Sequence, residues 1–121
     1  MESKKTMVIG ASENSQRYSY LATEKLKLFG HEVVAIANKK GIINGTPIIT
    51  ERPLLTDIDT VTLYINPALQ KAYYDYIISL QPKRIIFNPG TENEELYDLV
   101  KAHHIQAIEA CTLVMLSTGQ Y

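Results

Sequence analysis

The segment TMVIGASENSQRYSY, residues 6–20, decides how we interpret the rest of the chain. Its first residues form a short apolar run that suits a buried strand, and Gly10, Ala11 and Ser12 then interrupt the run with small side chains. An amphipathic stretch, residues 17–29, follows and predicts a helix. A strand, a turn of small residues and a helix make up the phosphate-binding half of a βαβ unit. Such a turn lets a ligand approach the backbone, and the helix N-terminus offers unpaired N–H groups to an anion.

Length and composition predict one ordinary globular domain over residues 1–121. The chain is 45% hydrophobic and 21% charged, and its formal net charge of −1 disfavours nonspecific binding of nucleic acids. No apolar run approaches ~18 residues and the start of the chain lacks a signal-peptide pattern, so we expect a cytoplasmic protein without membrane contact. The single cysteine, Cys111, excludes an internal disulfide and a cysteine-rich zinc site, and no metal site is expected.

Strands and helices alternate along the whole sequence. Short connections between them predict a parallel sheet with helices on both faces, a three-layer α/β fold. Right-handed crossovers then favour the strand order 3-2-1-4-5-6. The expected strands are, in chain order, residues 6–9, 32–37, 47–50, 60–65, 83–87 and 105–108. Between the second and third strands, residues 38–45 are expected to be a turn-rich connection.

The first helix, residues 17–29, shows apolar side chains at helical spacing. Tyr18, Leu21, Ala22, Leu26 and Phe29 fall on one face, which we expect to be buried. Tyr18 also starts the helix at the ligand edge, where it is expected to stack on a base or to brace the loop.

Ligands of open α/β sheets bind beyond the carboxyl ends of the strands. The segments that reach this edge are rich in small and amide-bearing residues, which bind polar ligands without titrating. Asn-Pro follows two different strands, as Asn66-Pro67 and Asn88-Pro89. The segments are residues 10–18, 38–41, 66–67, 88–91 and 109–112.

The first loop is neither a dinucleotide fingerprint nor a P-loop. Gly10 stands alone where GxGxxG needs three glycines, and GxxxxGK[ST] is absent. Ser12, Ser15 and Ser19 offer hydroxyl groups near the helix start. The guanidinium of Arg17 suits a bidentate phosphate contact. The alternative is that Arg17 is a surface side chain beside a loop.

The end of the second strand discriminates between nucleotide ligands. NAD-binding domains place a carboxylate there for the ribose hydroxyls, whereas this chain has Asn38, Lys39 and Lys40. Two cations in place of a carboxylate suit a phosphorylated ribose, as in NADP or coenzyme A. The alternative is a solvated pair of lysines in a loop.

Candidates for catalysis are few, and we assign no catalytic residue. Among the histidines, His31 lies at the entry end of the second strand, and His103 and His104 lie at a helix C-terminus. Cys111 follows the last strand, where a lone cysteine is usually an inert core residue; a reactive thiol is the alternative.

Four stretches of the sequence resemble the small stand-alone CoA-binding domain proteins: GASENSQRYSY, VTLYINP, IIFNPGTEN and EACTLVMLSTGQ. Those proteins are similar to the N-terminal CoA-binding domain of the succinyl-CoA synthetase alpha subunit. The resemblance covers residues 4–121 and implies a Rossmann-like fold that binds coenzyme A along the carboxyl edge of its sheet. The larger synthetases carry a second domain with a phosphorylated histidine, for which this chain has no room. The resemblance therefore implies binding more directly than catalysis.

The resemblance also implies the cofactor-binding residues. They would form a first-loop wall, a group near the 3′-phosphoadenosine, and a path for the pyrophosphate and pantetheine. In that order they are Gly10, Ala11, Ser12, Arg17, Tyr18 and Ser19; Asn38, Lys39 and Lys40; and Asn66, Pro67, Asn88, Pro89 and Gly90.

Three functional hypotheses follow from these patterns. The first is a module that binds CoA or an acyl-CoA without catalysis, since the ligand edge is well formed and no acid, base or nucleophile is evident. The second is an NADP-linked or acyl-CoA transforming enzyme that uses the same edge, with Cys111 or Glu109. The third is an interaction subunit whose ligand site has lapsed. Small α/β domains often pair through a helix face, so we also expect a homodimer or an unidentified protein partner.

Overall fold

The computed structural model describes residues 3–121 and has the expected α/β architecture. Within these residues a seven-stranded sheet runs in the order β3-β4-β2-β1-β5-β6-β7, and β3 alone is antiparallel to its neighbour. The central strands β1, β5 and β6 are buried along their whole length, as parallel strands covered on both faces should be. The strands are β1 Thr6–Ile9, β2 Val33–Ile36, β3 Gly41–Ile43, β4 Thr46–Ile49, β5 Thr60–Leu63, β6 Arg84–Phe87 and β7 Gln106–Glu109.

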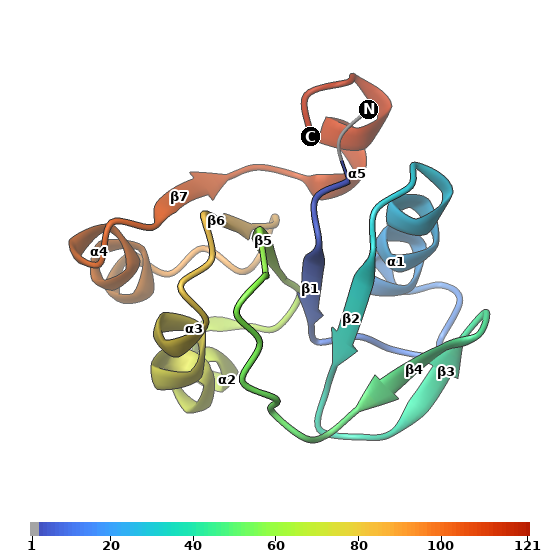
Figure 1. Ribbon diagram of the computed structural model, residues 1–121, viewed down its shortest axis with the longest axis horizontal. Coiled ribbons are helices and arrows are strands. Elements are labelled where there is room, and N and C mark those ends of the chain that lie inside the picture. Colours follow the sequence, from blue (N-terminus) through green and yellow to red (C-terminus); the bar gives the residue numbers. More distant parts are fainter. Residues whose placement is uncertain (1–2) are drawn as a thin grey trace.

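Helices cover both faces of the sheet and give three layers (Figure 1). On one face Leu26 of α1 and Leu116 of α5 pack with Val8 of β1. On the other face Ile77 of α3 and Leu96 of α4 pack in the larger core cluster. No helix within residues 3–121 has the length and apolar composition needed to cross a membrane. The helices are α1 Tyr18–Leu28, α2 Pro67–Gln70, the 3-10 helix η1 Lys71–Tyr73, α3 Tyr74–Leu80, α4 Glu94–Ala102 and α5 Thr112–Ser117.

The strand order expected from the sequence corresponds to β4-β2-β1-β5-β6-β7, and the structure has this order. The sheet contains one further strand, β3, at the edge beyond β4. The expectation that residues 38–45 form only a connection is therefore wrong for Gly41–Ile43. The overall arrangement remains a Rossmann-like sheet.

β3 and β4 form a hairpin closed by the two-residue loop Asn44-Gly45. Both loop residues have positive φ, 43° and 84° respectively. Positive φ at both positions is the geometry of a type I′ turn, whose twist matches that of the paired strands. The register places Ile43 opposite Thr46 and Ile42 opposite Pro47.

The buried face of α1 differs from the expected one. Tyr18 is 71% exposed and Leu21 is 39% exposed, so both were assigned to the wrong face. The buried stripe instead begins at Ser19 and continues through Ala22, Thr23 and Leu26, again at helical spacing. Small side chains in this stripe let the helix lie close to the sheet, and Tyr18 is left free at the helix start.

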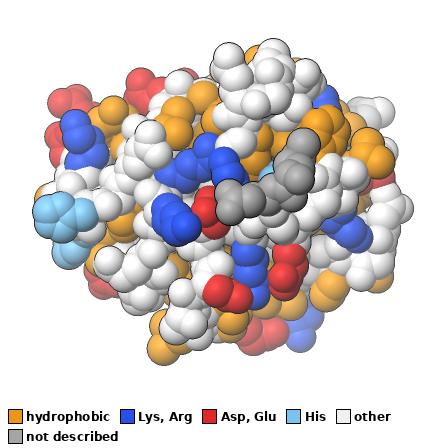
Figure 2. All heavy atoms as spheres, turned by 45° about the horizontal axis from the view of Figure 1, so that its top comes forward, with side chains coloured by type: hydrophobic (Ala, Val, Ile, Leu, Met, Phe, Trp, Pro, Cys, Tyr) orange, Lys and Arg blue, Asp and Glu red, His pale blue; other side chains and the backbone are white. Residues whose placement is uncertain are grey.

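The amino ends of the parallel strands form the edge of the sheet opposite the loop that leads from β1 into α1, and charged side chains are paired there. Figure 2 shows Lys and Arg side chains at the centre of this face with Asp and Glu beside them. Lys5 Nζ lies 3.4 Å from a Glu32 oxygen and 3.1 Å from an Asp57 oxygen, and Lys83 Nζ lies 3.8 Å from an Asp59 oxygen. These cations therefore have partners within the chain.

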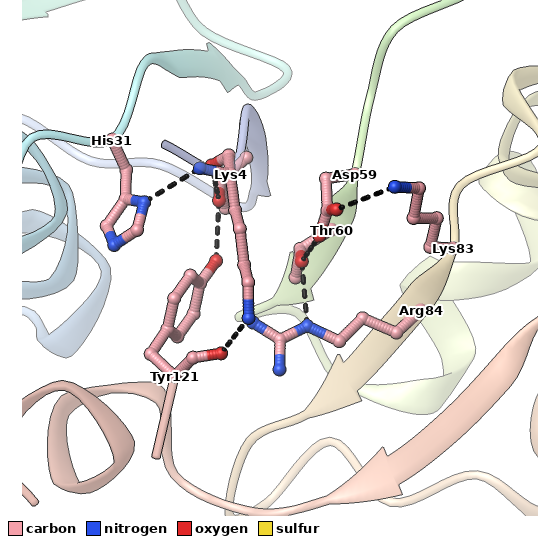
Figure 3. Close-up of polar contacts among 8 residues, drawn as sticks. Lys4, His31, Asp59, Thr60, Lys83, Arg84 and Tyr121 are labelled. Atoms are coloured by element: carbon pink, nitrogen blue, oxygen red, sulfur yellow. Dashed lines mark hydrogen bonds and ion pairs between the residues drawn. The ribbon is translucent and has the colours of Figure 1, made fainter. Parts of the chain in front are cut away.

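Arg84 is a buried cation at the amino edge, covered by Tyr121 (Figure 3). It is 8% exposed, and its Nε donates a hydrogen bond to Thr60 Oγ1 at 2.8 Å. Its guanidinium carbon lies 4.4 Å from the centre of the Tyr121 ring, a cation–π distance. The Tyr121 hydroxyl is bonded to Thr6 Oγ1 at 2.5 Å, and its carbonyl accepts a hydrogen bond from Lys4 Nζ at 2.5 Å. The tyrosine thus closes this edge over the arginine.

His31 belongs to the same cluster and is held neutral. It is buried, its Nδ1 accepts the backbone N–H of Lys4 at 2.9 Å, and its ring centre lies 4.9 Å from that of Tyr121. Burial lowers the pKa of His31, and the charges of Lys4 and Arg84 lower it further, against a smaller opposing effect of Asp59.

Candidate functional site

Loops that follow β1, β2, β5 and β6 meet at the carboxyl edge of the sheet and enclose two adjoining hollows. The outer hollow lies between the first loop and the β2–β3 connection and has a volume of about 490 Å³. The central hollow lies between the start of α1 and the loops after β5 and β6, with about 340 Å³. Ser12 lines both hollows, so they adjoin at the first loop. The two hollows therefore lie side by side along the carboxyl edge.

The outer hollow combines an apolar floor with charged walls. Ala11, Ala37 and Ile48 form the floor and are 8%, 8% and 3% exposed. Lys39 and Lys40 are exposed at the wall, and neither forms an ion pair with another residue in the described range 3–121. The remaining lining residues are Ser12, Glu13, Asn14 and Asn38. A flat aromatic group fits such a floor, and an anion fits the two lysines.

The central hollow is built around the N-terminus of α1. Arg17 is the N-cap residue, yet its side chain makes no capping hydrogen bond, and the first turn contains no acidic residue. The first N–H groups of an α-helix have no partner within the helix and carry a positive dipole end. Arg17, Tyr18 and Ser19 line the hollow at this point. The arrangement suits a phosphate group.

Residues 12–17 are held in shape by local hydrogen bonds. The Asn14 N–H donates to Ser12 Oγ at 3.1 Å, and the Gln16 N–H donates to Asn14 Oδ1 at 3.0 Å. The Arg17 N–H donates to the Asn14 carbonyl at 2.9 Å. These bonds hold the loop through contacts of its own, and the Ser12 hydroxyl keeps its own proton for donation.

Gly10 is required where the first loop leaves β1. Its φ is +95°, and a Cβ atom built there would lie 2.6 Å from Ile65 Cγ2 and 3.0 Å from the Tyr64 carbonyl. Its N–H donates to the Ile36 carbonyl at 2.9 Å. Glycine is therefore needed both for the backbone conformation and for the close approach to the chain after β5.

Asn66 and Asn88 occupy different environments although both precede a proline. Asn66 lines the central hollow, and its Oδ1 caps α2 by accepting the Leu69 N–H at 3.0 Å. Asn88 is 1% exposed and lies outside the lining of both hollows. Its Nδ2 donates to Thr62 Oγ1 at 2.7 Å, and its Oδ1 accepts the Thr112 N–H at 2.9 Å. Asn88 therefore ties the end of β6 to β5 and α5 and faces neither hollow.

The structure brings most of the sequence-predicted residues together. Pro67 occupies the first position of α2 and, like Asn88, lines neither hollow. Every other predicted residue lines a hollow: Ala11, Ser12, Asn38, Lys39 and Lys40 the outer one, and Gly10, Ser12, Arg17, Tyr18, Ser19, Asn66, Pro89 and Gly90 the central one.

Several lining residues were missed by sequence reasoning. Glu13 and Asn14 lie inside a loop that was expected, and is found, at the carboxyl edge of the sheet. The sequence therefore indicated their position but not the direction of their side chains. Thr91 lines the central hollow and belongs to the segment 88–91 that was expected at this edge. Ile48 enters the outer hollow from β4, and Tyr64 and Ile65 line the central one. Contacts across strands, which the sequence does not show, place these residues.

Two further side chains with titratable groups, those of Tyr64 and Cys111, lie near the carboxyl edge. The Tyr64 hydroxyl is buried without a hydrogen-bond partner among residues 3–121, and burial raises the pKa of this phenol, which stays protonated. Cys111 carries a free thiol at the N-cap of α5 and lines neither hollow. Within the described part of the chain, no three His, Cys, Asp or Glu residues are grouped to hold a metal ion.

A comparison with protein families matches residues 4–117 to the model of a CoA binding domain. The chain belongs to the CoA binding domain family. This match spans nearly the whole chain and includes every residue that lines the two hollows. The family supports a CoA-binding role. No curated protein matches the chain.

Solved structures similar to this CoA binding domain confirm the fold. One protein, described as uncharacterized, is 52% identical, with all of both chains covered (100% each) and a TM-score of 0.97. A hypothetical protein from Pyrococcus horikoshii OT3 is 20% identical over 97% of this chain and 84% of its own, with a TM-score of 0.83. A conserved hypothetical protein from Pyrococcus furiosus is 23% identical over 92% and 97%, with a TM-score of 0.81. At identities of 20% and 23%, the similarity to the two Pyrococcus proteins is evidence for the fold alone.

Proposed function

We propose that this protein binds coenzyme A or an acyl-CoA across the two hollows, as a binding or regulatory module without catalytic activity. The observation that carries the proposal is the junction of the hollows at Ser12, with unpaired cations on one side and an open helix N-terminus on the other. Coenzyme A is an extended ligand with a phosphorylated adenosine at one end and a pyrophosphate next to it. It would place the adenosine in the outer hollow beside the lysines and the pyrophosphate in the central hollow at the helix N-terminus.

The outer hollow suits the 3′-phosphoadenosine. An adenine ring would lie on the apolar floor, where burial of flat apolar surface is favourable. Lys39 and Lys40 would then be available to the 3′-phosphate, since no other residue in the described range pairs with them. Charge-assisted hydrogen bonds of this kind are the strong ones in phosphate recognition.

The central hollow suits the pyrophosphate and the start of the pantetheine. The pyrophosphate would accept hydrogen bonds from the first N–H groups of α1 and from the guanidinium of Arg17. The pantetheine would continue between Asn66 and Gly90, which line the far side of the same hollow. The Asn66 Nδ2 and the Gly90 carbonyl would serve the pantetheine, because Asn66 Oδ1 accepts the Leu69 N–H and the Gly90 N–H donates to Glu92 Oε1.

The absence of catalysis is inferred from the side chains that line the hollows. The Glu13 carboxylate accepts a backbone N–H, and the Tyr64 phenol stays protonated. Among the lining residues of the described chain, no nucleophile is held against a base that a third group orients, the arrangement that covalent catalysis needs.

A second candidate is an enzyme that uses NADP at the same edge. Lys39 and Lys40 favour it, because the 2′-phosphate of NADP asks for the same cations after β2. The two candidates differ in the ligand that the outer hollow prefers, so a direct competition separates them.

Calorimetric titration with CoA, dephospho-CoA and NADP tests the proposal. We expect CoA to bind most tightly, and a hundredfold excess of CoA over its Kd should stabilise the fold by about 2.7 kcal/mol. An NADP preference would favour the enzyme. No heat and no thermal shift with CoA would remove the proposal.

The double variant K39A/K40A tests the place of the 3′-phosphate. Loss of two charge-assisted contacts should weaken CoA roughly tenfold or more and leave dephospho-CoA nearly unchanged. The matched control is K71A/K101A, which removes the same charge from exposed positions on η1 and α4. Equal losses for both ligands would contradict a 3′-phosphate contact.

A further inference from the structure

The backbone N–H of Ile42, on the edge strand β3, has no acceptor within its own hairpin. In a hairpin with a two-residue type I′ loop, the residues that flank the loop exchange hydrogen bonds, here Ile43 and Thr46. The next pair, Ile42 and Pro47, is then a non-hydrogen-bonded pair. The Ile42 N–H therefore points away from β4, toward the flank where the sheet ends.

Glu13 occupies this flank. Its Oε1 accepts the Ile42 N–H at 2.9 Å, across 29 residues of sequence. Glu13 belongs to the first-loop wall of the outer hollow, and Ile42 comes two residues after Lys40, in the opposite wall. The carboxylate thus bridges the two walls between which the hollow lies.

Gly41 gives independent support for this contact. A Cβ atom at Gly41 would lie 2.4 Å from Glu13 Cγ and 2.6 Å from both Cδ and Oε1. Gly41 does not have a positive φ, so its backbone conformation is open to other residues. The missing side chain is therefore needed for the packing of Glu13 over β3.

We propose that Glu13 is a positioning residue that fixes the distance between the two walls of the outer hollow and so sets its affinity for the phosphoadenosine. This inference rests on the proposed function. When Glu13 holds the first loop against β3, the lysines after β2 face a hollow of constant width. Without that contact the walls separate part of the time, and the apparent affinity falls with the fraction of competent molecules.

The far end of the hairpin is held separately. Asn44 Nδ2 donates to a Glu24 carboxylate oxygen, and Lys27 Nζ donates to the Asn44 carbonyl at 3.0 Å. Both partners come from α1, so loss of the Glu13 contact leaves the hairpin attached to the protein. The effect of Glu13 should therefore be local, without loss of the fold.

The test combines calorimetry with hydrogen exchange of the Ile42 amide. E13A should weaken CoA and dephospho-CoA by the same factor, about fivefold, because it moves a wall rather than a phosphate contact. It should also speed exchange at Ile42. E13Q keeps a carbonyl oxygen that can accept the Ile42 N–H but lacks the negative charge. It should therefore match the wild type in CoA affinity and in slow exchange at Ile42, whereas a role that depended on the charge would make it behave like E13A. The matched control E24A removes a carboxylate from the other hairpin contact and should change neither.

A double-mutant cycle with Gly41→Ala isolates the contact. G41A alone should displace the Glu13 side chain and weaken CoA about as much as E13A does. On the E13A background the clash is gone, so G41A should cause no further loss. Full additivity, or unchanged CoA affinity and Ile42 exchange in E13A, would overturn this inference alone. A wild-type protein that does not bind CoA would overturn the proposed function and the role of Glu13 together, whatever the exchange data show.

Discussion

Cations gather at both edges of the sheet, but their partners differ. At the amino edge Lys5 and Lys83 are paired with carboxylates, and Arg84 lies under the Tyr121 ring. At the carboxyl edge Lys39 and Lys40 are exposed beside a hollow and lack ion pairs within residues 3–121. The two lysines of the amino edge are paired within the chain, and Arg84 is buried under the ring although its Nη2 has no hydrogen-bond partner among residues 3–121. These three cations are closed to a ligand, whereas Lys39 and Lys40 are exposed beside a hollow and open to one.

The difference follows from the direction of parallel strands. All strands except β3 begin at the amino edge, so the residues just before them meet there and pair with each other. At the carboxyl edge the chain leaves the sheet in loops, and α1 presents its N-terminus to them. Identical residue types therefore acquire different roles from their place along the strand.

A substitution of Asn88 is the strongest test of the difference between residues that stabilise the fold and residues that are open to a ligand. Asn88 lies at the carboxyl edge, but its side chain is buried and hydrogen-bonded within the chain. Asn88→Ala would remove three buried hydrogen bonds, to Thr62 Oγ1, to the Leu63 carbonyl and from the Thr112 N–H. Thr62 would keep its bond to Thr112 Oγ1, and the free energy of unfolding should fall by about 3 kcal/mol. Urea unfolding measures this fall, and Asn66→Ala, which removes one exposed cap, should cost only about 1 kcal/mol. If N88A kept its stability and lost CoA affinity, Asn88 would belong to the ligand site after all.

Arg84 and Arg17 should respond in opposite ways. Arg84→Ala removes the bond to Thr60 and the contact with Tyr121, so stability should fall by about 2 kcal/mol while CoA affinity is unchanged. Arg17→Ala should leave the urea midpoint unchanged and weaken CoA about tenfold, because a charge-assisted phosphate contact is lost. Denaturation and calorimetry on both variants check the pair of outcomes. A loss of CoA affinity in R84A would contradict the assignment of Arg84 to the fold alone.

His31 supplies a pH test of the amino edge. Its pKa is lower in the folded chain than the ordinary value of about 6.5. As the pH falls through that value, the unfolded chain takes up a proton that the folded chain declines, so the free energy of unfolding decreases by less than about 1.4 kcal/mol per pH unit. The decrease stops below the folded-state pKa. His31→Gln should remove this part of the slope, the exposed control His103→Gln should keep it, and equal slopes in the two would contradict the assignment.

The salt dependence of CoA affinity should give a smaller difference between the exposed lysines of the carboxyl edge and the paired cations of the amino edge. Raising the ionic strength from about 0.1 M to 1 M shortens the Debye length from about 10 Å to 3 Å, so contacts of exposed cations weaken. The Kd of CoA should rise severalfold over this range, and the rise should be smaller in K39A/K40A. Calorimetry at both salt concentrations measures it. An equal salt effect in the double variant would mean that these lysines do not meet the ligand's charge.

The sequence was sufficient for the central part of the fold. Apolar runs that hardly alternate predicted the buried strands, and the small residues after Ile9 predicted the turn into α1. The sequence missed β3 because three residues are too few for a strand pattern. The signal that was present is Asn44-Gly45, a dipeptide typical of type I′ hairpins, between two short apolar runs.

Orientation was the harder part of the site. The sequence placed Asn88 at the ligand edge, and only the side-chain contacts reveal that its amide turns inward to Thr62. Glu13 shows the reverse, since its bond to Ile42 joins residues that no local pattern connects. Loop membership can be inferred from periodicity, whereas the direction of a polar side chain depends on partners that arrive from distant strands.

The bond between Glu13 and Ile42 also has a consequence for the protein in concentrated solution. Unpaired backbone groups on the flank of a sheet are a template on which another chain can polymerise strand by strand. β3 offers only a short row, and the amide in its middle is already occupied. The carboxylate that ties a loop to this flank thereby also removes one of the few backbone donors on which such growth depends.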